Sequence, residues 1–167
     1  MDPARYAMIQ NVVATPKLWT AGSDLSSLWV QERQRRFPKP FFFRVTPSIG
    51  GKSIEGVFIE ARFKQTHVPG NRDSLNFSLV VDGVRVLGLD DNGPSRHLNL
   101  VGVGLPYYQQ QADHPHFNFS VPDALVGYAE PIPLAPPDDL WTAFLTRANI
   151  VGAPTFLLPA GQTELPI

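Results

Sequence analysis

The sequence predicts an α+β fold, namely a curved antiparallel sheet of about five strands with helices packed on one side. Seventeen prolines and thirteen glycines make up about 18% of the 167 residues, against an average of roughly 12%, and they are scattered rather than periodic. This distribution favours strands joined by many turns and excludes collagen and helix bundles. A hydrophobic share of 43% supplies a core, and the length indicates a single domain over residues 1–167, with an extended proline-rich tail from about residue 151.

The first predicted element is a helix over residues 24–36. Asp24 is a favoured N-cap residue, and the apolar residues after it share one helical face: Leu25, Leu28 and Trp29. Pro38 and Pro40 cannot continue a helix, because proline lacks the amide donor.

Four strands are predicted next. Residues 41–46 are aromatic and β-branched, and residues 57–64 alternate apolar with polar side chains, as a half-exposed strand does. The apolar runs 76–81 and 84–89 are separated by Asp82-Gly83, a pair that tolerates the positive φ angles of a tight turn. These two runs therefore predict a β-hairpin.

A fifth strand and a second helix complete the predicted elements. Residues 117–121 alternate aromatic or β-branched with polar side chains, which predicts a strand with one polar face. Residues 138–148 begin with acidic residues after two prolines, as the N-terminus of a helix favours. Three further prolines in the last seventeen residues predict that the tail is extended across the domain or a partner.

Charge and cysteine content narrow the class of protein. The net charge is −1, but residues 1–96 carry +4 and residues 97–167 carry −5, so the first part is the one expected to meet an anion. The chain has no cysteine, which excludes disulfide frameworks and thiolate chemistry. No secretory signal and no apolar run of about 18 residues is present, so we expect a cytoplasmic protein without a membrane partner. Motifs for nucleotide-driven or serine-hydrolase chemistry are also missing.

Three of the four histidines lie close together in the sequence. His97 follows the run Asp90-Asp91-Asn92-Gly93-Pro94-Ser95-Arg96, and His114 and His116 enter the strand at 117–121. Side chains two residues apart in an extended chain point to one side, so His114 and His116 are expected to converge.

This histidine cluster has three possible uses, which the sequence leaves open. Histidine takes and gives a proton near neutral pH, so two imidazoles, with Arg96 beside the phosphate, suffice for metal-free cleavage of RNA by its own 2′-hydroxyl. The same histidines with Asp90 or Asp91 could instead hold a metal ion. In the third interpretation, residues 90–93 form only a turn and the histidines are loop residues on the surface.

A basic and aromatic segment is the second candidate site. Its cations are expected to hold RNA phosphates while bases stack on the neighbouring phenylalanines; they are Arg33, Arg35, Arg36, Lys39 and Arg44. The alternative is that the arginines end a helix in solvent and the phenylalanines enter the core.

Residues 77–79 and 82–92, followed by Arg96-His97, resemble the hairpin and aspartate-asparagine-histidine pattern of the TumE-like proteins, toxin partners of bacterial toxin-antitoxin pairs. The segments 93–94, 114–116, 127–131 and 148–150 are similar to a related family, in which an HxH pair on a strand is followed by an aromatic-alanine-x-proline strand. The resemblance covers roughly residues 55–150.

This resemblance implies an α+β domain, a helix-turn-helix antitoxin as partner and an action on RNA. Where the TumE-like pattern has two histidines flanking an arginine, this chain has only His97, so the second histidine would come from His114 or His116. The predicted function is a toxin-like endoribonuclease whose catalytic residues are His97, His114, His116, Arg96 and Asp90, with no cofactor. The alternative is a non-enzymatic mobile-element or phage-defence component that binds a protein or ribonucleoprotein through its hairpin and tail.

Overall fold

The computed structural model describes residues 2–33, 37–93 and 95–160. These residues form two α-helices, α1 (Pro3–Ala14) and α2 (Pro137–Arg147), together with strands in three sheets, which confirms the α+β class. No helix in these ranges combines the length and apolar character that crossing a membrane requires.

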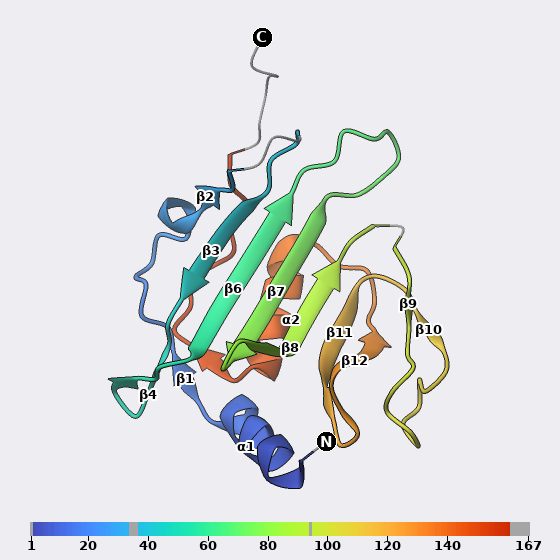
Figure 1. Cartoon of the computed structure of the whole chain (residues 1–167). Helices are drawn as coiled ribbons and strands as arrows, with labels where there is room; N and C mark the ends of the chain where they lie inside the picture. The colour runs from blue at the N-terminus through green and yellow to red at the C-terminus, as the bar shows by residue number, and fades with distance from the viewer. Residues whose placement is uncertain (1, 34–36, 94, 161–167) are drawn as a thin grey trace.

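The main sheet is antiparallel and has seven strands, in the order β12-β11-β8-β7-β6-β3-β2 (Figure 1). Its strands are β2 (Val30–Gln31), β3 (Phe41–Val45), β6 (Val57–Lys64), β7 (Ser74–Val81), β8 (Val84–Asp91), β11 (His116–Val121) and β12 (Ala124–Pro131). Five of these match the strands predicted from residue patterns, including the hairpin of β7 and β8. The other two, β2 and β12, form the edges and raise the strand number above the expected five.

One face of the main sheet is covered by α2, which lies behind the sheet in Figure 1. Alternate residues of β6 and β7 turn towards it and are buried, as the period of two predicted. Trp141 of α2 lies at the centre of an aromatic cluster, with ring centroids 5.0 Å from Phe77 and 5.7 Å from Phe156. Because Phe156 is 5% exposed, this part of the proline-rich tail belongs to the core. No helix or strand occurs in residues 152–160.

The predicted helix over residues 24–36 is wrong within the described part of the chain; residues 34–36 lie outside it. Only a 3₁₀ turn, η1 (Ser26–Leu28), follows Asp24, and the chain then extends into β2, which pairs with β3. Trp29 explains the change, because its ring packs 4.7 Å from Phe43 and its Nε1 donates to the carbonyl oxygen of Leu157. Packing and strand pairing therefore prevail over the local helical pattern.

No helix was predicted over the residues that form α1. It begins at Pro3, after the N-cap Asp2. At its end the buried Lys17 ammonium donates to the carbonyl oxygens of Val12, Val13 and Thr15, at 2.6, 3.1 and 2.6 Å. Burial lowers the pKa of Lys17 to about 8. This buried cation thus satisfies carbonyls that a helix end leaves without intrahelical partners.

Two small sheets flank the main one. Strands β1 (Lys17–Leu18), β4 (Ser48–Ile49), β5 (Lys52–Ser53) and β13 (Ile150–Val151) form the first, in which β13 runs parallel to β1. Strands β9 (His97–Leu98) and β10 (Gln111–Ala112) form the second, within the segment that joins β8 to β11. This segment carries His97 towards the open face of the main sheet.

Candidate functional site

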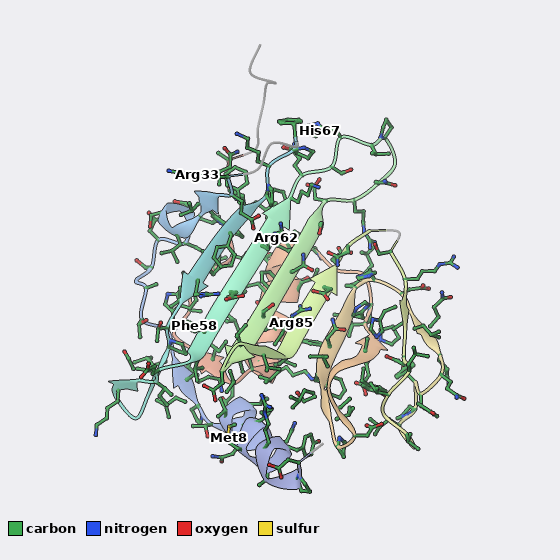
Figure 2. All side chains as sticks on the ribbon, viewed as in Figure 1. Met8, Arg33, Phe58, Arg62, His67 and Arg85 are labelled. Atoms are coloured by element: carbon green, nitrogen blue, oxygen red, sulfur yellow. The ribbon has the colours of Figure 1, made fainter. Side chains whose placement is uncertain are left out.

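The face of the main sheet that α2 leaves open is polar. Figure 2 shows Phe58, Arg62 and Arg85 on this face, turned towards the viewer. A groove of about 550 Å³ lies along it, within the range of roughly 300–1,000 Å³ that is usual for ligand sites. Hydroxyl, amide and charged side chains from β6, β7 and β8 line most of the groove. Asn92 and Ser95 border it on the segment that leads to His97.

Three histidines meet on the open face beside this groove. The ring centroid of His116 lies 4.1 Å from that of His114 and 5.6 Å from that of His97. The structure therefore brings together all three predicted histidines, including the pair two residues apart. The fourth histidine, His67, lies apart, in contact with Phe37 at 4.6 Å between ring centroids.

Backbone groups orient each imidazole of the cluster. His97 Nε2 lies 2.9 Å from the carbonyl oxygen of Gly127, so Nε2 carries the proton and Nδ1 is left as a proton acceptor. His116 Nδ1 lies 3.1 Å from the carbonyl oxygen of Asp113. His114 Nδ1 lies 3.2 Å from both the amide nitrogen of Asn92 and the carbonyl oxygen of Asp90, which leaves Nε2 for a ligand.

His116 differs from its two neighbours in burial. It is 2% exposed, whereas His97 and His114 are half-buried. Burial, reinforced by the nearby charge of His114, lowers the pKa of His116 to about 4, although Asp90 and the carbonyl of Asp113 act in the opposite direction. His116 is therefore neutral at neutral pH and is a poor proton donor there.

Asp90 is held by a polar network on the open face. Its Oδ1 and Oδ2 accept hydrogen bonds from Arg85 at 2.5 and 2.8 Å, and Oδ2 also accepts one from Asn118 at 2.7 Å. Oδ2 lies 3.9 Å from His116 Nε2. Both carboxylate oxygens are thus engaged, so Asp90 is suited to orienting its neighbours rather than to moving a proton.

Arg85 reaches Asp90 because β8 contains a bulge. The register with β7 shifts between Leu79, which pairs with Leu87, and Val80, which pairs with Arg85. This shift places Arg85 on the same face as Gly88 and Asp90. The guanidinium then lies across Gly88, where a Cβ atom would collide with it.

The segment that carries His97 is fixed to β12 by Asn99. This residue is fully buried; its Nδ2 donates to the carbonyl oxygen of Ala129 at 2.8 Å, and its Oδ1 accepts from the Ala129 amide at 2.6 Å. Asp123 secures the same segment further on, by accepting from the amide of Gly102 at 2.9 Å. The position of His97 therefore depends on contacts with β12.

The remaining predicted catalytic residue, Arg96, is exposed in the segment between β8 and β9. Within residues 2–33, 37–93 and 95–160, no group of three or more histidine and carboxylate side chains is arranged to hold a metal ion.

The predicted basic segment is only partly on this face. Arg44 lies there, but its Nε donates to Glu60 at 2.6 Å and its guanidinium packs over the ring of Phe58. Arg33 is exposed beyond β2, and Lys39 is half-buried. Arg35 and Arg36 lie outside the described residues.

Sequence reasoning missed several residues of the site. Arg85 escaped because strict alternation assigns it to the face opposite Asp90, five residues later. Asn118 and Asn99 carry no recognisable motif, although asparagines amid apolar runs often indicate buried hydrogen bonds. Lys64 belongs to the alternating pattern of residues 57–64, which does not reveal the groove beside it.

Comparison with known proteins gives no match: no family model, no curated protein and no solved structure is similar to this chain. The resemblance to the TumE-like proteins therefore stays a prediction. The function has to be argued from the open face itself.

Proposed function

We propose that the protein cleaves RNA through its 2′-hydroxyl group, with His97 and His114 as the acid/base pair. The observation that supports this most is the meeting of three histidines on the open polar face, two of them partly exposed. Histidine is the side chain best suited to exchange protons near neutral pH.

The hydrogen bonds of the cluster suggest which histidine has which role. His97 donates through Nε2 to Gly127, so its Nδ1 takes the proton from the 2′-hydroxyl. The 2′-oxygen then bonds to phosphorus, the bond to the 5′-oxygen breaks, and His114 gives a proton to that leaving oxygen. The products are a 2′,3′-cyclic phosphate and a 5′-hydroxyl end, and Arg96 offsets the charge of the phosphorane.

His116 and Asp90 act as positioning residues in this proposal. His116 is in ring contact with both His97 and His114, and its low pKa keeps it uncharged between them. A charged imidazole at that place would lower the proton affinity of both neighbours. Asp90, fixed by Arg85 and Asn118, in turn faces His116.

The test is cleavage of a labelled single-stranded RNA by wild type, His97→Ala and His114→Ala, each with and without EDTA. We expect both variants to lose at least about 100-fold in rate, with unchanged thermal melting, because general acid–base catalysis contributes roughly 10²–10⁴-fold. Lys52→Gln, on the distant strand β5, is the control and should cut like wild type. Undiminished cleavage by both histidine variants would refute the proposal, and loss in EDTA would reassign the histidines to a metal.

A second substrate separates the two roles. An RNA with sulfur in place of the 5′-bridging oxygen has a better leaving group, which does not need protonation. His114→Ala should recover most of its rate on this substrate, whereas His97→Ala should not. If only His97→Ala recovers its cleavage rate on the sulfur-containing RNA, then His97 is the acid and His114 is the base.

The non-enzymatic alternative is favoured by one observation. Three large apolar side chains near His97 are strongly exposed, at 53% for Leu98 and 72% each for Leu100 and Val103. Exposed apolar side chains of this size suit a protein partner, for which the resemblance suggests a helix-turn-helix antitoxin. Co-purification of a partner with wild type but not with Leu100→Asp would support binding there. Deleting the tail is an unsuitable test, because Phe156 belongs to the core.

A further inference from the structure

We propose that the open face holds two successive nucleotides of single-stranded RNA, with the phosphate that links them at Lys64. This inference rests on the proposed function and names the part of the substrate beside the histidines. It follows from the shape of the open face, from the pairing of its charges and from the aromatic rings at its ends.

Two hollows meet at Lys64. The first is the groove of about 550 Å³ described above, and the second, of about 420 Å³, lies towards the loop between β6 and β7. Three residues line both hollows: Lys64, Ser74 and Asn92. A ligand of two similar units joined by a short linker would fit this arrangement, with the linker at the shared residues.

Among the described cations that line the two hollows, Lys64 is the one without a carboxylate partner. The arginines around the hollows are each paired with a carboxylate: Arg44 with Glu60, Arg62 with Glu32, Arg72 with Asp91 and Arg85 with Asp90. In the described part of the chain, Lys64 has neither an ion pair nor a hydrogen bond from its exposed ammonium. One uncompensated positive charge at the junction matches one phosphodiester.

Each hollow also presents aromatic surface. Phe42 lines the first, half-buried beside Arg44. The second is lined by Phe37 and His67, which come from separate segments of the chain. Their ring centroids lie 4.6 Å apart. Nucleobases stack on the faces of such rings.

The polar lining of the first hollow completes the match to a base. Asn76 gives one hydrogen bond to Ser74, at 3.3 Å, and its amide oxygen remains available as an acceptor. Bases are accessible to such groups and to stacking only when they are unpaired, which selects single-stranded over duplex RNA. Asn92 and Ser95 line the path along which the RNA strand would continue from the groove towards His97.

The experiment is a titration with the 2′-O-methyl dinucleotide UpU, followed by NMR. This ligand cannot be cleaved through its 2′-oxygen, so binding is measured independently of catalysis. Lys64→Gln should weaken binding by about tenfold, the equivalent of roughly 1.4 kcal/mol, and should reduce the slope of log affinity against log salt by about 0.7. Lys52→Gln, the same exchange at an exposed lysine of β5, is the matched control and should bind like wild type.

Two altered ligands test the phosphate and the second base. Wild type should bind UpU with an uncharged methylphosphonate linker about tenfold more weakly than it binds charged UpU. Lys64→Gln should bind the uncharged ligand no more weakly than it binds charged UpU. Uridine 5′-monophosphate fills one hollow and should bind more weakly than UpU; equal affinity would identify a mononucleotide site and overturn the proposal. Tighter binding of duplex RNA than of single-stranded RNA by the wild-type protein would also overturn the proposal.

The outcomes distinguish this inference from the proposed function. If UpU binds Lys64→Gln as tightly as wild type, or binds neither, the nucleotide site is refuted, even if His97-dependent cleavage is observed. If UpU binds through Lys64 but no RNA is cut, the site stands and the nuclease proposal fails.

Discussion

The two faces of the main sheet belong to the same strands but are stabilised by different kinds of interaction. The face under α2 is an apolar and aromatic layer in which Trp141, Phe77 and Phe156 are each 5% exposed or less. The open face holds charges, amides and imidazoles, nearly all of them engaged with a partner. Apolar packing has no direction, so the first face needs only side chains of suitable type and size. Hydrogen bonds and ion pairs have direction, so the second face depends on where each atom lies.

The bulge in β8 shows the difference most clearly. Val86, the extra residue of the bulge, and Leu87, which follows it, are both buried in the core at 1% exposure, so the core accommodates the bulge. On the open face, the same shift brings Arg85 over Gly88 to Asp90. A one-residue change of register thus leaves the core intact and creates the polar network.

The largest expected effect is on the covered face, at Phe156. Phe156→Ala should lower the free energy of unfolding by about 4 kcal/mol, because it removes a buried ring from the cluster around Trp141. Leu157→Ala, next in the chain and 53% exposed, is the control and should change it by less than about 0.5 kcal/mol. Chemical denaturation measures both. Equal, small effects would show that the tail is not part of the core.

The next effect is the pH dependence of stability that His116 contributes. Its pKa is lowered from 6.5 to about 4 in the folded protein, so between these values the unfolded chain binds a proton that the folded protein does not. The contribution of His116 to the free energy of unfolding is fully present above pH 6.5 and is lost as the pH falls towards 4. The total loss is about 3 kcal/mol.

His116→Gln is the variant that isolates this contribution, because the carboxylates titrate alike in both proteins. The difference in free energy of unfolding between wild type and His116→Gln should shrink from pH 7 to pH 4. A constant difference across this range would show that His116 titrates normally and that burial does not determine its charge.

A smaller effect is expected at Gly88. Gly88→Ala should lower the free energy of unfolding by about 2 kcal/mol, because the new methyl group displaces Arg85 and leaves Asp90, whose side chain is 10% exposed, without its cation. In an Arg85→Ala background the same exchange should change little, which a double-mutant cycle measures. Additive effects would contradict the displacement.

Arg62→Gln is the matched control for an ion pair on the same face. Arg62 is bonded to Glu32 with side chains 51% and 34% exposed, so its loss should change stability by less than about 1 kcal/mol. An effect as large as that of Gly88→Ala would show that burial does not distinguish the two pairs.

Local sequence patterns were sufficient to predict several strands and helix α2. Strand β6 has the predicted bounds, 57–64, and α2 lies one residue before its predicted position. The turn of the β7–β8 hairpin has positive φ at Asp82 and Gly83, 49° and 75°, as the pair suggested. These elements agree because their patterns are set by nearest neighbours and by burial of one face.

Other elements depend on distant partners. Trp29 leaves the expected helix because Phe43 and the carbonyl of Leu157 hold it, and Leu157 is 128 residues away. Of the candidate site, the contact between His114 and His116 was predicted, although His114 lies in a bend before β11 and not in the extended strand on which the prediction relied. The arrival of His97 beside them does not follow from local patterns, because it depends on the contacts of Asn99 with Ala129.

By itself, the sequence determined the α+β class, five of the strands of the main sheet, helix α2 and the histidines as the residues to examine. The tertiary structure alone decided that the histidines share one open face, that His116 is buried and neutral, that Arg85 holds Asp90, and that Lys64 lies where two hollows meet. The physical reason is the range of the interactions. Hydrophobic periodicity and turn preferences act within a few residues, whereas burial, ion pairing and pKa depend on which distant segments meet.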